Sequence, residues 1–381
     1  MSDKRSIFEE VSDEAPSTRT PPAGGMIDKG KRGARRGIRA WLLVLFALVV
    51  LMIAVGGLTR LTDSGLSITE WKPVTGAIPP MNAADWQSEF EKYQQIPEFQ
   101  LQNSGMSLEE FKSIYWWEWG HRQLGRVIGL VWFLGFAGFL AARAIPVGWT
   151  GRLVLIGALG GLQGAVGWWM VSSGLTGTML DVASYRLATH LGLAFIILGF
   201  IAWYVFLLGR EERDLMQARR SREAKQWGIA TGWLHLAFVQ ILLGALVAGI
   251  DAGQSFTDWP LMGGQVVPPQ AFDLTPVWRN FFENPGLVQF IHRCVAYVLA
   301  IYAVMALLKG RKSAHAGTRA AFSAAFIAVL GQVGLGIYVL FSGVQAHVAL
   351  THQIIAVLVW VLILRARFQA GYPVADKIKG A

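Results

Sequence analysis

Eight apolar stretches, each about 20 residues long, constrain this chain more than any other feature. They run over residues 40–58, 120–142, 152–173, 186–208, 229–250, 289–308, 320–341 and 347–365. In hydrocarbon a helix satisfies its own backbone hydrogen bonds, so such stretches predict membrane spans. Charged residues make up only 15% of the 381 residues, too little charge to cover a soluble fold of this size. We therefore predict an all-α integral membrane protein with eight transmembrane helices.

Lysine and arginine are concentrated in alternate loops. They cluster in residues 1–39, after the fourth and sixth stretches, and in the C-terminal tail, whereas the long loops 59–118 and 251–288 are acidic or neutral. The positive-inside rule then predicts that both termini are cytoplasmic. The net charge of +9 reflects this topology, and we expect no nucleic-acid partner. Residues 1–39 lack the apolar core of a signal peptide and predict a disordered tail, in a bacterial inner membrane.

The chain repeats itself in two halves. Each half has a glycine at a helix exit, an acidic residue followed by tryptophan, a Pro-Pro pair, a histidine followed by arginine, and a Thr-His pair, in the same order. These landmarks are Gly57, Glu70-Trp71, Pro79-Pro80, His121-Arg122 and Thr189-His190, then Gly249, Asp258-Trp259, Pro268-Pro269, His292-Arg293 and Thr351-His352. Because each half has an even number of spans, the halves share one orientation, which predicts two tandem four-helix bundles related by a pseudo-two-fold axis along the membrane normal.

This repeat divides the chain into a first unit and a second unit. We predict the following segments: a cytoplasmic tail over 1–39, a first four-helix unit over 40–209, a cytoplasmic linker over 210–228, a second four-helix unit over 229–366, and a tail over 367–381.

Four of the seven histidines occupy matched positions: His121, His190, His292 and His352. Each is expected in the first two turns of a span that runs inward, so all four should lie near the periplasmic face. An ionisable side chain inside a span is costly and usually functional. Two imidazoles from facing helices can take both axial positions of a haem iron. We predict that His121 pairs with His190, and His292 with His352.

Other metals and other interpretations of nearby residues stay open. Zinc or copper usually takes a third or fourth ligand, which Glu118 could supply in the first half but Gln289 could not in the second. Glycines in the third and seventh spans would let a flat macrocycle approach, although helix packing explains them equally well. Arg122, Arg126 and Arg293 could pair with haem propionates, or be interfacial arginines that reach toward water.

The two halves differ beside their first histidines. Glu118 stands three residues before His121, which predicts that both lie on one helix face, while the second half has Gln289 before His292. A carboxylate near a haem edge can move protons or stabilise a developing cation, and an amide cannot. We therefore predict a reaction in the first half and a permanent haem in the second, with a purely structural Glu118 as the alternative.

With these residues in hand, the chain resembles the haem A synthase family over about residues 40–366. The resemblance rests on the stretch Gly56–Ser67, the Glu118-x-x-His121-Arg122 motif, the Thr-His pairs and the repeat. Such enzymes oxidise the C8 methyl group of haem O to a formyl group, making haem A for terminal oxidases. The route implied is successive hydroxylation, through an alcohol and then a hydrate that loses water, with water as the oxygen source.

The resemblance also implies roles for the site residues. His121 and His190 would be ligands to the substrate haem O, Glu118 a catalytic carboxylate, and His292 and His352 the ligands of a haem b cofactor. Some relatives carry paired cysteines in the outer loops. The only cysteine here is Cys294, which lies in the sixth span, so the chain is similar to the group that lacks the pair.

The partners implied are haem O synthase, cytochrome oxidase assembly factors and an electron donor that the sequence does not identify; a homo-oligomer is an open alternative. The main alternative function is a membrane cytochrome b that transfers electrons, although such proteins usually stack haems across the membrane. A transporter with repeated halves is a further alternative, but its polar sites usually lie at the midplane.

Overall fold

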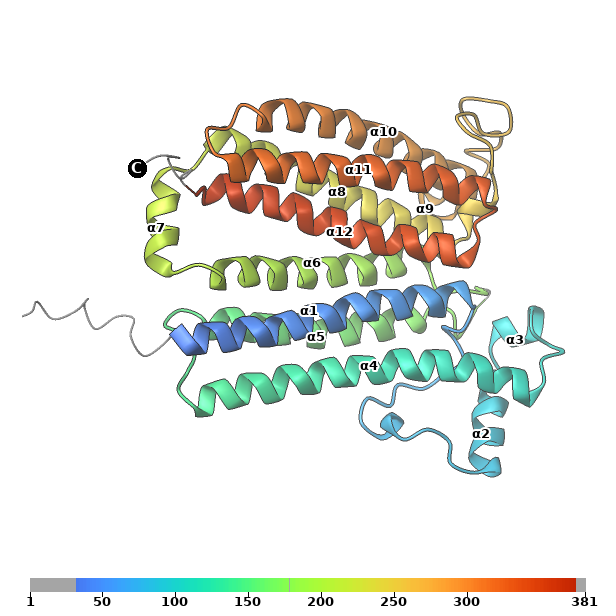
Figure 1. Cartoon of the computed structure of the whole chain (residues 1–381). Coiled ribbons are helices and arrows are strands. Elements are labelled where there is room, and N and C mark those ends of the chain that lie inside the picture. The colour runs from blue at the N-terminus through green and yellow to red at the C-terminus, as the bar shows by residue number, and fades with distance from the viewer. Residues whose placement is uncertain (1–31, 178, 375–381) are drawn as a thin grey trace, which may run out of the picture.

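Figure 1 shows the computed structural model, which describes residues 32–177 and 179–374. Long helices run side by side through the molecule, and eight of them in this part of the chain are long and apolar enough to cross a membrane. They are α1 (Arg32–Leu61), α4 (Leu108–Ala141), α5 (Thr150–Val171), α6 (Ser184–Leu208), α8 (Ala224–Gly249), α10 (Pro285–Gly310), α11 (Ala316–Phe341) and α12 (Ala346–Gly371). The predicted all-α membrane fold is confirmed.

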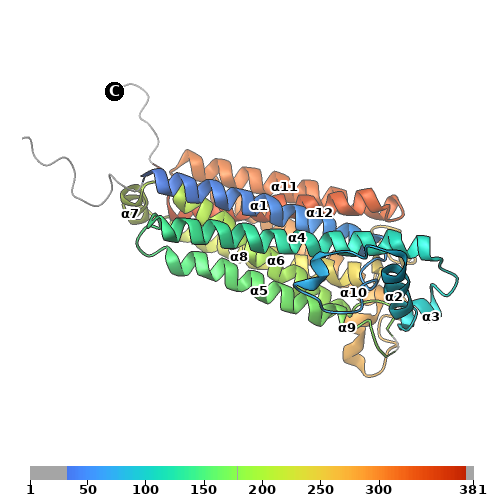
Figure 2. The same ribbon diagram turned by 90° about the horizontal axis from the view of Figure 1, so that it is seen from below.

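Shorter helices gather at the two ends of the bundle (Figures 1 and 2). The end that carries residues 62–107 and 250–284, here called the loop end, holds η1 (Thr75–Ala77), α2 (Ala83–Tyr93), α3 (Pro97–Leu101), η2 (Ala252–Gln254), η3 (Val277–Arg279) and α9 (Asn280–Glu283). The opposite end holds α7 (Glu212–Arg220), inside the segment 210–228 predicted as a linker. Helix α7 is amphipathic and buries Leu215 and Ala218 against the bundle.

The centre of the bundle is formed by α1, α6, α8 and α12, and the other four long helices pack around it. Helix α4 packs on α1, α5 on α6, α10 on α8 and α11 on α12. Small residues let α6 approach its neighbours: a Cβ at Gly192 would lie 2.6 Å from Leu242, and one at Gly199 would lie 3.1 Å from Trp360. The matched pairings support the pseudo-two-fold relation, which stays a prediction, as do the segment boundaries.

All eight long helices begin before the expected spans, and the difference is largest for α1 and α4. Helix α1 begins at Arg32, inside the segment 1–39 predicted as a disordered tail, of which residues 1–31 lie outside the described residues. Helix α4 begins at Leu108 because Ser107 and Glu110 form a reciprocal capping box there. Its added turns bury Phe111 and Tyr115 in a cluster at the loop end. His121 therefore lies in about the fourth turn of α4, not in the first two turns as expected.

The helix ends match the two halves of the repeat in a different alignment from the one expected, which matched Gly57 with Gly249. Helix α1 ends at Leu61 and α8 ends at Gly249. Asp63 and Asp251 each follow two residues later, and each has a left-handed φ of +48°. The same separation along the chain pairs Gly56 with Gly244. Glycine spacing alone allows two registers about one turn apart, and only the helix ends distinguish them.

Candidate haem sites

The repeat-matched histidines lie on the four long helices that begin at the loop end, His121 on α4, His190 on α6, His292 on α10 and His352 on α12. The pairing of His121 with His190, and of His292 with His352, stays a prediction. All four side chains are half-buried. Two imidazoles are therefore available in each half of the chain.

Each of these imidazoles packs against a glycine on a neighbouring helix. A Cβ at that glycine would come too close to Cε1 of the ring, so glycine lets the ring lie directly against the next helix. The distances from such a Cβ to Cε1 would be 2.9 Å for Gly56 and His121, 2.8 Å for Gly167 and His190, 3.2 Å for Gly244 and His292, and 3.0 Å for Gly336 and His352. The same arrangement at four positions indicates a built site.

Glutamine amides contact two of the histidines from the glycine-bearing helices α5 and α11. Nε2 of Gln163 donates to the main-chain oxygen of His190 at 2.9 Å and lies 3.2 Å from its ring Nδ1. Nε2 of Gln332 donates to the main-chain oxygen of His352 at 2.9 Å and lies 3.3 Å from its ring Nε2. Both glutamines stand in matched positions of the repeat, which is the signal by which the sequence could have revealed them.

A third amide, Gln240 on α8, holds His292. Its Nε2 donates to the main-chain oxygen of His292 at 3.1 Å and also lies 3.1 Å from ring Nδ1. His121 differs, because among the described residues no glutamine amide contacts it, and its Nδ1 is buried without a hydrogen-bond partner. Sequence reasoning missed Gln240, since the first half has no glutamine at the matching place.

The donor set suits a planar iron macrocycle held between two helices. Nδ1 of His121 and of His352 is buried without a partner within residues 32–177 and 179–374. A Cβ at Gly160, Gly164 or Gly331, on the glycine-bearing helices, would meet nothing within 4 Å. Two imidazoles per half match the axial ligands of a haem iron, and the open glycine faces leave room beside them. In the same part of the chain, no group of three or more His, Cys, Asp or Glu side chains is arranged to hold a metal ion.

Glu118 anchors the segment that follows α1. Its side chain is 3% exposed, and Oε2 accepts hydrogen bonds from Ser67 Oγ and from the main-chain nitrogen of Ile68, both at 2.7 Å. Oε1 accepts from Arg122 Nη2 at 2.6 Å. Both carboxylate oxygens are therefore engaged one turn from His121, toward the loop end. The Glu118 carboxylate therefore holds the segment that follows α1 in place.

The repeat counterpart, Gln289, makes the same kind of anchor with opposite polarity. Its Nε2 donates to the main-chain oxygens of Gly253 and Phe256, at 3.3 and 2.9 Å. The loop of the first half therefore offers N–H and O–H donors to a carboxylate, whereas the loop of the second half offers carbonyl acceptors to an amide. Each side chain therefore suits the hydrogen-bonding groups of its own loop, Glu118 in the first half and Gln289 in the second.

The arginines predicted to bind propionates also hold these loops. Each donates to main-chain oxygens of the segment that follows α1 or α8. The acceptors are Ile68 and Glu70 for Arg122, Lys72 and Pro73 for Arg126, and Phe256, Asp258 and Leu261 for Arg293. Nε of Arg293 is buried without a partner among the described residues, so one donor remains for a ligand. The propionate contacts stay a prediction.

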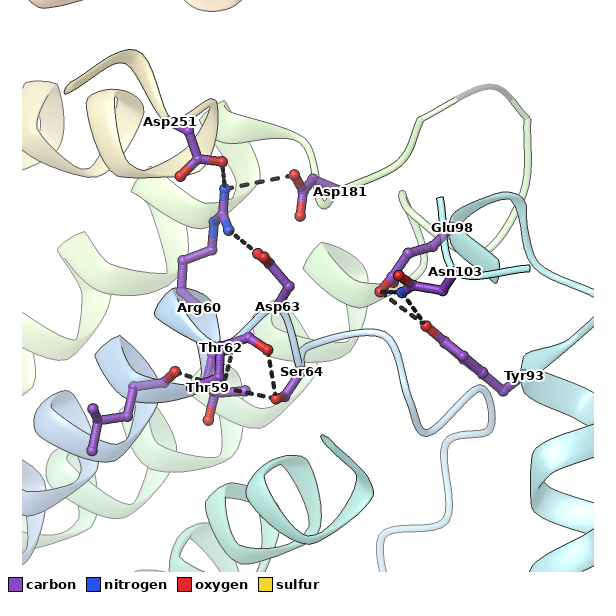
Figure 3. Close-up of polar contacts among 11 residues, drawn as sticks. Thr59, Arg60, Thr62, Asp63, Ser64, Tyr93, Glu98, Asn103, Asp181 and Asp251 are labelled. Carbon is purple, nitrogen blue, oxygen red and sulfur yellow. Dashed lines mark hydrogen bonds and ion pairs between the residues drawn. The ribbon is translucent and has the colours of Figure 1, made fainter. Parts of the chain in front are cut away.

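An ion cluster joins the two halves at the loop end (Figure 3). Arg60, at the end of α1, contacts Asp63 at 2.7 Å, Asp251 of the second half, and Asp181 at 3.6 Å. The Arg60 side chain is only 13% exposed. Burial raises the pKa of Asp181, and Arg60 opposes that rise. The cluster fixes the end of α1 against the end of α8, beside the histidine-bearing helices.

A second polar cluster lies on α3 (Figure 3). Glu98 is 4% exposed and accepts from Tyr93 Oη at 3.1 Å and from Asn103 Nδ2 at 3.2 Å. Burial raises the pKa of Glu98 to about 8, although the Tyr93 hydrogen bond lowers it. The folded loop end therefore holds a proton on Glu98 that the unfolded chain releases at a pH of about 4.3.

We expect Glu98→Gln to remove a pH dependence of the loop end. Because the folded pKa is raised, the stability of this segment should be full below about pH 4.3 and should fall as the pH rises to about 8. Glutamine resembles the protonated acid, so at pH 9 the variant should resist limited proteolysis of residues 83–103 better than wild type. At pH 4 the two should be equal. The exposed Glu91→Gln is the control, and an equal difference at both pH values would contradict the prediction.

Comparisons with known proteins match nearly the whole chain. Residues 39–364 match the family described as "Cytochrome oxidase assembly protein". A protein of Ruegeria pomeroyi named "Heme A synthase" is 68% identical, with all of both chains covered. Proteins with the same name from Ruegeria sp. (strain TM1040) and Paracoccus denitrificans are 66% and 61% identical, each with 99% of both chains covered.

Proposed function

This chain belongs to the cytochrome oxidase assembly protein family, and we propose that it is a haem A synthase, which converts haem O to haem A for a terminal oxidase. One observation carries the proposal beyond the family: four histidines in two pairs, each packed against a glycine of the adjacent helix. A substrate that is itself a haem needs a ligand pair, and a resident haem needs another.

The two pairs have different roles in this proposal. His121 and His190 bind the iron of haem O in the first half, and His292 and His352 bind a resident haem b in the second. When bound, haem b supplies an electron carrier. The enzyme is an oxidoreductase that converts the C8 methyl group to a formyl group with water as the oxygen source, a four-electron oxidation whose electrons would leave through haem b, when bound, to an external electron acceptor. The histidines position the macrocycle, and the outer loops held by Arg122, Arg126 and Arg293 exclude bulk water from it.

Glu118 belongs to the first site in this proposal. It lies on the same helix as His121, one turn toward the loop end, and its charge is balanced by Arg122. A carboxylate held beside a guanidinium in a buried site favours cationic character that develops on a nearby substrate edge. Its bonds to Ser67 and Ile68 also place the loop that covers this edge. Only the charge effect is confined to the first half, because Gln289 anchors its own loop but carries no charge.

The proposal includes a place in the cell and a route for the substrate. We place this multi-pass protein in the bacterial inner membrane, with both termini cytoplasmic and the loop end periplasmic; its eight apolar helices and the basic residues of alternate loops support this. Haem O is apolar and would enter between helices from the lipid. Haem O synthase and oxidase assembly factors are the proposed partners.

A membrane cytochrome b that only transfers electrons is the second candidate. It is favoured by the fact that each half offers two imidazoles, which fill both axial positions of an iron.

A haem analysis separates these two functions. We would co-express the full chain with a haem O synthase in a host that makes no haem A. The haems of the purified protein would be identified by pyridine haemochrome and chromatography, with cells that carry the haem O synthase alone as the control. The synthase requires haem b together with haem O or haem A. Two equivalents of haem b, with no haem A in the cells, would instead identify the electron-transfer protein.

A further inference from the structure

We propose that Gln163, Gln240 and Gln332 are positioning residues for the haem ligands, and that Met52 occupies the fourth such place. Within residues 32–177 and 179–374, His121 is then the one ligand without an amide partner, and the first site is built to release its haem. The inference deepens the proposed function and rests on its assignment of a haem to each histidine pair.

Each glutamine restrains its histidine in two ways. The amide Nε2 is bonded to the main-chain oxygen of the histidine and touches the ring, so helix and imidazole are held together. The Oε1 atoms of Gln163, Gln240 and Gln332 are all buried without a partner among the described residues. An imidazole that binds iron through one nitrogen carries a hydrogen on the other, which needs an acceptor. The orphan oxygen belongs to the amide that already touches the ring.

Met52 stands where the fourth amide would be. Gln240 precedes Gly244 by four residues, and Gly244 faces His292. Met52 precedes Gly56 by four residues, and Gly56 faces His121. Four residues are about one helical turn, so Met52 and Gln240 lie on equivalent faces of α1 and α8.

The side chain of Met52 reaches the same helix that carries His121. Its Cε is 3.6 Å from the position of a Cβ at Gly125, which lies one turn beyond His121 on α4. A thioether donates no hydrogen bond and accepts only weakly, so it restrains neither the ring nor the main chain of His121. The glycine contact of His121 is as close as the other three, so the missing amide is what distinguishes this ligand.

This difference matches the different tasks of the two halves. Both ligands of the second half are held by amides, as a permanent haem requires. In the first half His190 is held and His121 is not, which suits a haem that must enter and leave in every turnover. Loss of such an outer partner typically costs about 10–100-fold in metal affinity, which is enough to separate a resident haem from a passing one.

Two reciprocal variants test this assignment. Met and Gln have similar lengths, so each exchange changes the hydrogen bonding of the side chain and little else. Protein loaded with haem in cells would be mixed with apomyoglobin, and chromatography would identify which haem leaves and how fast. Gln240→Met should release haem b about 10–100-fold faster than wild type. Met52→Gln should slow the release of the first-half haem by up to about 10-fold. The midpoint potential of haem b should also rise in Gln240→Met, because the imidazole N–H loses its acceptor.

Gln369→Met is the matched control. Gln369 is another amide on a spanning helix, and its Oε1 is buried without a partner among the described residues. It lies beside Gly317 of α11, far along α12 from His352. The variant should change neither quantity. If Gln240→Met does not fold, Gln332→Met tests the other ligand of the same haem. Unchanged haem b release and potential, or a Met52→Gln protein that releases its haem as fast as wild type, would overturn the inference. Absence of haem O conversion with altered haem b release would instead refute the proposed function alone.

Discussion

His292→Ala protein is expected to lose its haem b, whereas His121→Ala protein should keep haem b and make no haem A. An iron ligand matters more than its outer partner, so each loss should exceed the roughly 10–100-fold effect of an outer partner. The two variants separate the halves because the pairs share no ligand. Haem content by pyridine haemochrome and haem A by chromatography measure the two outcomes.

His347→Ala provides the control for this pair. His347 is exposed and lies on α12, five residues before His352, so the same helix is changed without touching the site. It should retain haem b and haem A formation. Loss of haem b from His121→Ala with retention by His292→Ala would reverse the assignment of the halves. Equal loss from both would indicate one shared site.

Glu118→Gln is expected to lower haem A formation by at least about 100-fold while haem b is retained. The amide carries no charge, and its N–H group would face the Ile68 N–H, the Ser67 hydroxyl or the Arg122 guanidinium, all of which are donors at present. The first loop should therefore loosen over the substrate site. Haem A per unit of haem b is the quantity to measure.

Ser67→Ala divides the two effects of Glu118. It removes one loop anchor and leaves the carboxylate and its charge in place. A loss equal to that of Glu118→Gln would mean that Glu118 acts by placing the loop, while a small loss would mean that its charge acts on the substrate. Exposed Glu109→Gln, on the same helix, is the control and should behave as wild type. Unchanged haem A in Glu118→Gln would remove Glu118 from the reaction.

The sequence predicted the helices better than their ends. The spans were recognisable because a helix in lipid must be apolar for about 20 residues. The start of α4 was missed, because its first turns lie at the loop end and are recognisable only from the capping box at Ser107. The alignment of the two repeats at the ends of α1 and α8 also differed from the expected one, because several glycines allow more than one alignment.

The site was predicted in its ligands but not in its surroundings. His121, His190, His292 and His352 stood out because polar residues in a span are rare and these four repeat. The roles of the arginines were inferred from charge and position, but the structure occupies most of their donors with loop carbonyls. Gln240 gave no signal, because its importance depends on a contact between two helices.

The sequence by itself determined a membrane bundle of repeated halves with two histidine pairs, since apolar length and repeated motifs are properties of the chain alone. Only the tertiary structure decided which glycine faces each imidazole, which histidines are contacted by a glutamine amide, and which groups donate hydrogen bonds to Glu118. These facts depend on the rotation and height of each helix relative to its neighbours. Hydropathy does not encode them, because many rotations bury the same apolar stretch equally well.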